Sequence, residues 1–375
     1  MRIDSVEVLR ADKYTFVALA TDTGLVGYGE AGLWAFPDTQ AAALTEIGAT
    51  IVGRNALNRT DIYQDVYRYM HFRGAAISGA LSAIDIALWD LAGKRYDAPI
   101  YDLLGGRVRD RARVYKHIDA PTREGLVDNA LDAVSAGYSA VRFNVLELHG
   151  PVVGDQRIID NVVGLVADVR GAVGPDIDIC LECHFRLNRA TALAVARAVE
   201  PFHVFFMEDP LPPEDLRGVV TLAKRTRVPL AVGERLQTLE EYGHLLSGGH
   251  VTYVRPDIAL AGGFTQLTKI AAVAAAHGAR VIPHNYLSPL TTAASVQLDM
   301  ATPNFALQEY LGDDPADSVR GGILSNPLVR EGAHLLAPDG PGLGVMLDLD
   351  YLRSLEKCAA PVRAARDRDG GVIDQ

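Results

Sequence analysis

Cysteine, tryptophan and long apolar runs are scarce in this sequence. Its 375 residues include two tryptophans and three cysteines, Cys180, Cys183 and Cys358. Three cysteines do not make a disulfide framework, so we expect a protein of the reducing cytoplasm. An uninterrupted apolar run of about 18 residues is absent, and the first residues lack the charged and apolar regions of a signal peptide. We therefore expect no membrane partner.

Positive charge is also in short supply. The chain has 36 Lys and Arg against 47 Asp and Glu, which gives a formal net charge of −11. Polyanions bind to clustered Lys and Arg, so this balance argues against a nucleic-acid partner. A small anionic ligand is still compatible with it, because a local site can oppose the net charge of the chain. The composition, 49% apolar and 22% charged, is that of a globular protein.

Two changes of residue pattern divide the chain into three parts. Residues 1–30 resemble β-strands and residues 38–104 have helical apolar spacing, which together predict a small α+β domain. From residue 112 onward, eight β-rich runs alternate with amphipathic stretches, the pattern of a (β/α)₈ barrel. The alternation ends near residue 316, and we expect the last segment to pack against the first domain. The expected domain boundaries are 1–111, 112–315 and 316–375.

Ionisable residues close six successive β-rich runs of the expected barrel. They follow one another at intervals of 23 to 27 residues, about one βα unit, and are Glu182, Glu208, Glu234, Asp257, His284 and Glu309. Because the carboxyl ends of barrel strands meet at one mouth, we expect these side chains to converge. Three carboxylates brought together require a cation, and oxygen ligands without sulfur suit Mg²⁺. Glu182, Glu208 and Glu234 are therefore the predicted metal ligands; the alternative is that they cap helices or lie on the surface.

Two histidines are candidates for acid–base chemistry. His284 and Asp257 end neighbouring strands, and an Asp beside a His orients the imidazole and raises its basicity, so the pair predicts a general base. His184 lies two residues after Glu182, and strand alternation would point both into the mouth. The alternatives are a core histidine satisfied by a carbonyl for His284 and a surface loop histidine for His184.

Two other motifs carry no chemistry in this interpretation. Cys180 and Cys183 match the spacing of a redox or zinc motif, but the match lies within a strand. An odd separation then sends the two sulfur atoms to opposite faces, so we expect packing residues. The glycine pairs at 105–106 and 262–263 fit neither a dinucleotide fingerprint nor a phosphate-binding loop.

The motifs taken together resemble the enolase superfamily, in its mandelate racemase-like branch, over nearly the whole chain. The matched segments occur in order and are TDTGLVGYGEA, ALSAIDIALWDLAGK, PIYDLLGG, MEDP, GER, ALAGGFT, QEY and PGLGV. The resemblance implies a modified (β/α)₇β TIM-type barrel with an α+β capping domain built from both chain ends. It also implies one Mg²⁺ per subunit, a small-molecule carboxylate substrate whose α proton is removed to give an enediolate, and a homo-oligomer.

Within that branch the chain is most similar to acid-sugar dehydratases of the galactonate type. Those enzymes carry a carboxylate-x-His at the third barrel strand, here Glu182 to His184, and a basic-x-Asn at the second, here Arg142 to Asn144. Racemase-like members place a second lysine where this chain has Asn144. Mannonate dehydratase-like relatives are the second choice among dehydratases, because they lack the strand-end acid that is Asp257 here. The chain departs from the galactonate pattern in having Glu182 for the usual Asp and Arg142 for the common Lys.

The resemblance implies dehydration of a sugar acid, an aldonate or similar, to a 2-keto-3-deoxy acid. His284, paired with Asp257, would remove the C2 proton, a protonated Glu309 would help to stabilise the enediolate, and His184 would protonate the leaving hydroxyl. The predicted substrate-binding residues are Arg142, Asn144, Trp34, His71, Arg73 and Lys116, and His117 is a weaker candidate. The alternatives are an epimerase or cycloisomerase acting on an acid sugar or its lactone, and a non-catalytic protein that keeps the fold.

Overall fold

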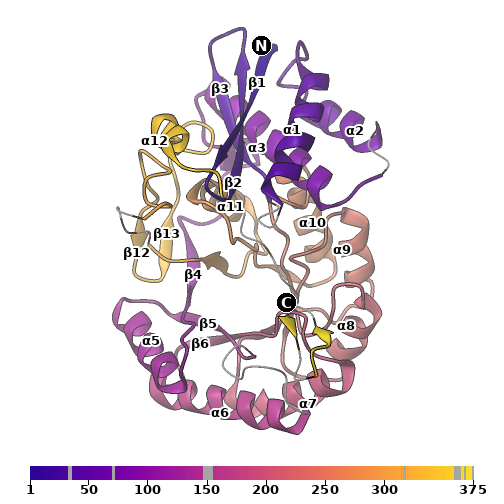
Figure 1. Ribbon diagram of the computed structural model, residues 1–375, viewed down its shortest axis with the longest axis vertical. Coiled ribbons are helices and arrows are strands. Elements are labelled where there is room, and N and C mark those ends of the chain that lie inside the picture. The colour runs from indigo at the N-terminus through magenta and orange to yellow at the C-terminus, as the bar shows by residue number, and fades with distance from the viewer. Residues whose placement is uncertain are drawn as a thin grey trace.

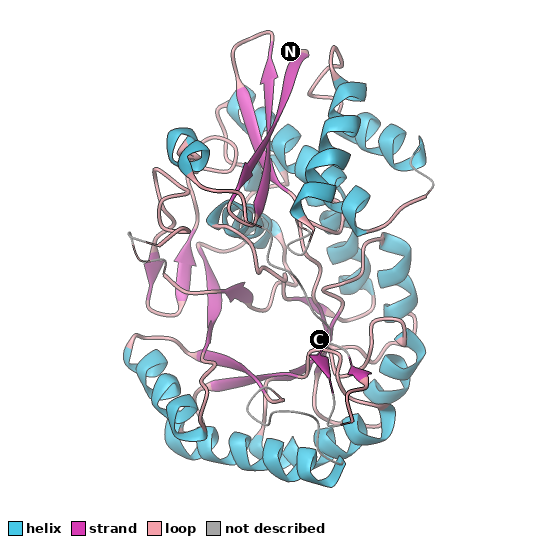
Figure 2. Cartoon of the chain, in the orientation of Figure 1, coloured by secondary structure: helices cyan, strands magenta, loops and turns pink. Residues whose placement is uncertain are grey.

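The chain forms two bodies that lie one above the other in Figure 1. The computed structural model describes residues 1–32, 36–69, 72–146, 155–313, 315, 318–358, 365–366 and 369–373. The upper body holds an antiparallel sheet with helices beside it, and the lower body holds a ring of strands with helices around its outside (Figure 2). The fold class expected from the sequence, a barrel with an α+β cap, is confirmed.

The capping body is a three-stranded sheet packed on helices. Its elements are β1 (Ile3–Ala11), β2 (Tyr14–Thr21), β3 (Val26–Glu30), α1 (Pro37–Ile51), α2 (Arg59–Tyr69) and α3 (Ala75–Tyr96). Helix α3 lies directly on β3 because two glycines remove the side chains between them. A Cβ on Gly27 would be 2.2 Å from the carbonyl oxygen of Ala87, and one on Gly29 would be 2.0 Å from that of Ala83.

Helix α3 is also the most apolar helix of the cap. By length and composition it could cross a membrane, but 72% of its most apolar window is buried inside the molecule. It contacts β2, β3 and α1 on one side and barrel helix α10 (Gly263–Ala276) on another. Its apolar character is thus explained by its position in the core between the two bodies.

The barrel consists of eight parallel strands in a closed ring. They are β4 (Arg111–His117), β5 (Ala140–Asn144), β6 (Asp178–Glu182), β7 (Phe206–Glu208), β8 (Leu230–Val232), β9 (Tyr253–Val254), β10 (Arg280–Val281) and β11 (Gln308–Tyr310). A parallel bridge between Val281 and Phe305 joins β10 to the start of β11, and β11 pairs with β4. This closure leaves no free edge in the barrel sheet.

Helices connect successive barrel strands. They are α5 (Arg123–Ser135), α6 (Asp155–Val173), α7 (Arg189–Val199), α8 (Leu216–Ala223), α9 (Leu239–Leu246), α10 and α11 (Pro289–Ala301), with a short α4 (Ile100–Leu103) before β4 and a 3₁₀ turn, η2 (Glu200–Phe202), after α7. After β11, the described residues form no eighth barrel helix. The (β/α)₈ pattern read from the alternation is therefore corrected to (β/α)₇β, the form that the family resemblance implied.

The chain after the barrel contacts both bodies. Strands β12 (Arg330–Glu331) and β13 (His334–Leu336) form a hairpin that pairs with the first half of β4. Helix α12 (Leu349–Ser354) packs on β1, and the Asp12 carbonyl accepts a hydrogen bond from the Cys358 amide at 3.0 Å (Figure 1). A separate hairpin joins β14 (Ala365–Arg366) and β15 (Val372–Ile373). Of these elements, α12 packs on the cap, β12 and β13 extend the barrel sheet, and Figure 1 draws the last hairpin, in yellow near the C label, beside the barrel. That residues 316–375 complete the cap stays a prediction.

The barrel interior contains one apolar side chain from each strand or its immediate end. These form a single buried cluster of Tyr115, Ala140, Cys180, Phe206, Ala231, Tyr253, Ile282 and Leu307. Cys183 belongs to the other cluster, between strands and helices, so the two cysteines face opposite ways as expected. Two residues beyond each member, the inward positions at the mouth are His117, Arg142, Glu182, Glu208, Gly233, Arg255, His284 and Glu309.

Two acids of the cap are buried against barrel helices. Glu30, at the end of β3, accepts hydrogen bonds from the Ser288 amide (3.1 Å) and from the hydroxyls of Ser288 (2.5 Å) and Thr291 (2.6 Å) at the start of α11. Asp85 of α3 accepts from the Thr265 amide at 2.9 Å, near the start of α10. Both helices begin just after mouth residues, so the cap holds the loops that carry them.

Glu30 makes a testable contribution to the pH dependence of stability. Burial raises its pKa to about 7, although hydrogen bonds from Ser288 and Thr291 oppose the rise. The folded chain therefore binds more protons than the unfolded chain between about pH 4.5 and 7, and stability falls as pH rises through this window, by on the order of 3 kcal/mol. In Glu30→Gln this loss should be absent, so the thermal midpoint should fall less than in the wild type between pH 5 and 8.

The exposed Glu46 on α1 provides the control. Glu46→Gln should keep the pH dependence of the wild type, measured by circular dichroism melts. Parallel midpoint-against-pH curves for the wild type and Glu30→Gln would contradict the assignment.

Candidate active site

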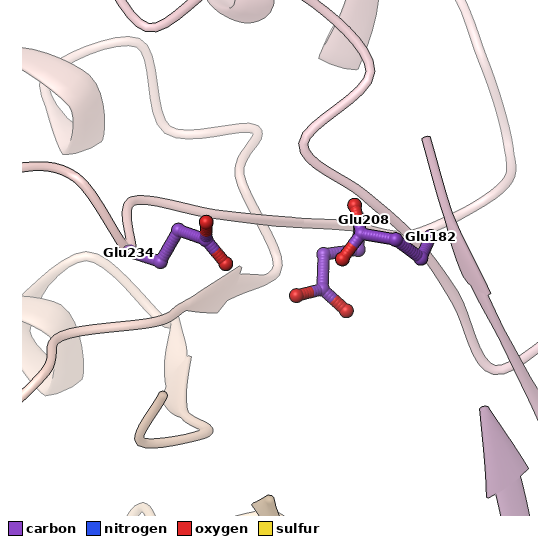
Figure 3. Close-up of side chains that lie close together, drawn as sticks. All are labelled: Glu182, Glu208 and Glu234. Carbon is purple, nitrogen blue, oxygen red and sulfur yellow. The ribbon is translucent and has the colours of Figure 1, made fainter. Parts of the chain in front are cut away.

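Three glutamates from successive strands meet at the barrel mouth. Glu182 ends β6, Glu208 ends β7, and Glu234 follows β8 by two residues. One oxygen from each lies within 4.8 Å of the other two, and Figure 3 shows the three carboxyl groups facing a common space. Glu234 reaches this space because Gly233 turns the chain with φ +120°, a conformation that side chains rarely adopt. The convergence expected from the sequence is therefore observed.

The donor set fits a hard divalent cation. Both oxygens of Glu208 are buried, and two arginines lie near them, but among the described residues no donor reaches either oxygen with hydrogen-bond geometry. Burial, followed by the charge of Glu182, raises the pKa of Glu208 to about 8, although Arg255 and Arg142 oppose the rise. A cation with oxygen ligands would remove this cost, since it both pairs the charges and fills the open lone pairs.

Arg255 was not identified as a site residue from the sequence. Its side chain is fully buried, and its Nη2 lies 2.7 Å from Glu208 Oε1 and 2.7 Å from Glu309 Oε2. Its Nη1 donates to the Tyr115 hydroxyl at 3.2 Å. Strand period two could have found it, because Arg255 lies two residues after the interior Tyr253 and two before Asp257.

Arg142 reaches the same carboxylates from β5. Its Nη2 forms an ion pair with Glu182 Oε2, and its Nε lies 3.5 Å from Glu208 Oε2. Burial by itself would lower the pKa of Arg142, but Glu182 and Glu208 outweigh this effect and raise it well above its usual value. Arg142 is thus a permanent cation at the mouth.

Asp257 and His284 form the dyad that their spacing predicted. Asp257 Oδ2 lies 2.7 Å from His284 Nδ1, and the two backbones form a parallel bridge. The other nitrogen of the ring, Nε2, lies 3.6 Å from Glu234 Oε2 and 3.9 Å from Glu309 Oε2. Burial would lower the pKa of His284, but Glu234, Glu309 and Asp257 raise it to about 10.

The surroundings of Glu309 favour its charged form, whereas the resemblance implied a protonated carboxyl. Burial alone would raise its pKa, but Arg255, His284 and His117 hold the pKa well below the usual value. Its Oε2 also accepts a hydrogen bond from the Asn285 amide at 2.8 Å, and His117 Nε2 lies 3.1 Å from Oε1. A carboxylate in this state accepts hydrogen bonds and donates none.

His184 lies beside the cluster, but not for the expected reason. Strand β6 ends at Glu182, and His184 and Phe185 have left-handed φ values of 48° and 64°, so strand alternation does not continue to this residue. Burial, followed by the charges of Arg235 and Arg186, lowers the pKa of His184 to about 3, which makes the ring neutral. Its buried Nδ1 lacks a hydrogen-bond partner among the described residues.

The remaining predicted substrate residues have different placements. Lys116 lies between the inward Tyr115 and His117, and its Nζ donates to the Leu311 carbonyl at 3.4 Å. Its substrate-binding role stays a prediction. Asn144 is buried at the end of β5, where its Oδ1 accepts from the Leu146 amide at 2.9 Å.

Three further predicted substrate-binding residues, Trp34, His71 and Arg73, belong to the N-terminal part of the chain. Arg73 is exposed, with its guanidinium 3.8 Å from the centroid of the Tyr67 ring. Trp34 and His71 lie outside the described residues.

Two family models match the chain. Residues 3–105 match the mandelate racemase / muconate lactonizing enzyme N-terminal domain, and residues 125–351 match the enolase C-terminal domain-like family. Among curated proteins, D-galactonate dehydratase of Xanthomonas axonopodis pv. citri (strain 306) is 33% identical over 348 residues, 92% of this chain and 91% of the relative. That of Ralstonia nicotianae is 32% identical over 374 residues, 96% of each.

Solved structures agree with this placement. The crystal structure of an enolase from Agrobacterium radiobacter, bound to Na and L-malate, has a TM-score of 0.94 and 26% identity, with all of both chains covered. The 3,6-anhydro-D-galactonate cycloisomerase from Zobellia galactanivorans has a TM-score of 0.85 and 27% identity, over 94% of this chain and 99% of the other.

The buried position of Arg255 leads to a prediction about stability. Arg255→Met removes the cation between Glu208 and Glu309 and leaves two carboxylates buried without it. Loss of one partner from a buried ion pair costs about 3–5 kcal/mol, so the thermal midpoint in the presence of EDTA should fall by many degrees. Arg227→Met, at a guanidinium that is 88% exposed, is the control and should melt like the wild type. Equal midpoints for both variants would refute a structural role for Arg255.

Proposed function

Because the chain belongs to the enolase superfamily, in the mandelate racemase / muconate lactonizing enzyme family, and is similar to D-galactonate dehydratases, we propose that it converts an aldonate or similar acid to a 2-keto-3-deoxy acid. The observation that carries the mechanism is the Asp257–His284 pair, whose free Nε2 faces the three-glutamate cluster. A base next to a cation site is what removal of a weakly acidic α proton requires.

We assign Glu182, Glu208 and Glu234 as the ligands of one Mg²⁺ ion. When bound, such an ion would polarise the substrate carboxylate and so acidify the proton on C2. All three ligands are glutamates on rigid strand ends, and hard oxygen donors favour this ion over softer metals. Glu182 stands where the related dehydratases have the shorter Asp, and the geometry above includes its oxygens within the cluster.

His284 is the proposed base. It accepts a proton only when neutral, and in the ligand-free site the charges of Glu234 and Glu309 keep its pKa high. A cation held by Glu234 would offset the largest of these charge effects and would so favour the neutral ring of His284. Asp257 meanwhile holds Nδ1, which leaves Nε2 to take the proton from C2.

The enediolate oxygens need positive charge and hydrogen-bond donors. Glu309 cannot donate in its charged state, so we propose that it orients His117 and His284 instead. Arg142 is the permanent cation within reach of the mouth and is the proposed partner of the substrate carboxylate.

His184 is the proposed donor to the departing 3-hydroxyl. It comes from β6, whereas His284 follows β10, so the two imidazoles enter the mouth from different strands. The neighbouring Arg235 and Arg186 keep its ring neutral. An anionic substrate offsets these charges and allows the ring to gain the proton that it then donates.

An epimerase or cycloisomerase is the second candidate. Two histidines from different strands suit proton removal on one face and proton delivery on the other, and a cycloisomerase is among the similar structures. Such an enzyme would release no water from its substrate.

Product analysis in D₂O distinguishes these activities. We expect the purified protein with Mg²⁺ to convert at least one acid sugar of an aldonate and aldarate panel into a product lighter by one water, with deuterium at C3. Mass spectrometry measures both changes, and EDTA-treated protein is the control. Deuterium incorporation without loss of water would overturn the dehydratase proposal in favour of the isomerase.

A substitution at His284 tests the base. His284→Asn should lower kcat at least about 10²-fold, since it removes the general base but retains a side chain of similar shape. The divalent-cation site should persist in this variant, because all three glutamate ligands are retained. His250→Asn, at an exposed histidine, is the matched control and should keep full activity. Turnover that survives His284→Asn would refute the assignment.

A further inference from the structure

We propose that Arg142 is a resident counter-ion of the carboxylate cluster, which leaves Glu182 when the divalent cation binds and then pairs with the substrate carboxylate. Cation and substrate would therefore bind cooperatively. The inference rests on the proposed function in one respect, that the three glutamates hold a divalent cation. The inference gives Arg142 a second role, as counter-ion of the metal-free cluster. It also couples the binding of cation and substrate, which the reaction itself does not require.

The Arg142 guanidinium lies among the ionisable groups of the barrel mouth. All three of its nitrogens face site residues: Nη2 pairs with Glu182, Nε lies 3.5 Å from Glu208 Oε2, and Nη1 lies 3.3 Å from His117 Nδ1. It therefore spans two of the three glutamates that would hold the cation. A lysine has one ammonium group and could not make these three contacts at once.

Each carboxylate oxygen of Glu182 already accepts a hydrogen bond. Its Oε1 accepts a hydrogen bond from the His184 amide, and its Oε2 is taken by Arg142. The amide is fixed by the backbone, whereas the arginine side chain can rotate. A cation that binds Glu182 would meet Arg142 at the same carboxylate, and the repulsion between the two positive charges opposes the presence of both.

Arg255 and Arg142 differ in how firmly their guanidinium groups are held. The Arg255 guanidinium is completely buried and bound on both sides by Glu208 and Glu309, so it stays in place. Arg142 is 12% exposed, at the open end of β5. Of these two cations of the cluster, Arg142 is the one able to turn toward an incoming carboxylate, which a guanidinium binds through two parallel hydrogen bonds.

Metal binding without turnover tests the proposal. Mn²⁺ serves as the probe and is titrated into metal-free full-length protein, with free Mn²⁺ followed by electron paramagnetic resonance. Arg142→Gln should bind Mn²⁺ at least tenfold more tightly than the wild type when no organic acid is present. Arg142→Lys keeps the positive charge but loses the planar, two-pronged guanidinium. Its Mn²⁺ affinity should lie between those of the wild type and Arg142→Gln. Affinity equal to or weaker than that of the wild type in Arg142→Gln would overturn the proposal.

The coupling is measured with L-malate, a 2-hydroxy acid that an enolase-superfamily structure binds. In the wild type, saturating L-malate should tighten Mn²⁺ binding severalfold, after correction for Mn²⁺ complexed in solution. In Arg142→Gln this gain should be clearly smaller, because the direct contact between acid and cation remains but no guanidinium is left to be released. An equal gain in both proteins would also overturn the proposal.

Three controls separate the possible failures. Arg225→Gln, at an exposed arginine, should match the wild type throughout. Circular dichroism melts in EDTA confirm that each variant folds. Glu208→Gln should abolish the Mn²⁺ site; if the wild type has no site that this variant removes, the metal assignment fails and this inference with it. If the site is present and Arg142→Gln leaves it unchanged, only the counter-ion role fails.

Discussion

Compensation of buried negative charge at the barrel mouth is the constraint on which this structure depends. Five carboxylates converge there, namely Glu182, Glu208, Glu234, Asp257 and Glu309. Arg255 is fully buried among them. It pairs with Glu208, one of the three clustered glutamates, and with Glu309, which lies beside the proposed base His284. Neighbouring carboxylates of this kind remain charged only if cations are close, and Arg255 lowers the pKa of both Glu208 and Glu309.

The cap takes part in the same arrangement. Asp257 and His284 lie in the loops that lead into α10 and α11, and the cap holds these helix starts through Asp85 and Glu30. Gly32 adds a backbone hydrogen bond to the Ala259 carbonyl, only two residues after Asp257. The dyad geometry is therefore supported by contacts between the two bodies as well as within the barrel.

The surroundings of Glu309 and His184 differ from those expected from the sequence. The resemblance implied a protonated Glu309, whereas Arg255, His284 and His117 lower the pKa of this carboxyl and so favour its charged form. His184 was expected to follow strand alternation, yet the strand ends before it and two left-handed residues set its direction. The two departures from the galactonate pattern, Glu182 and Arg142, contact each other, so they form one change of the site rather than two.

The sequence by itself determined the strand-end acids, the Asp257–His284 pair and the opposite directions of Cys180 and Cys183, because these depend on local period and on the spacing of βα units. The same local rule would have reached Arg255, two residues from Asp257. Only the tertiary structure decided that Arg142 pairs with Glu182 in the carboxylate cluster and that the surroundings of Glu309 favour its charged form. These features arise from side chains brought together across more than twenty residues of sequence, and the free energy of a buried charge depends on all such neighbours at once.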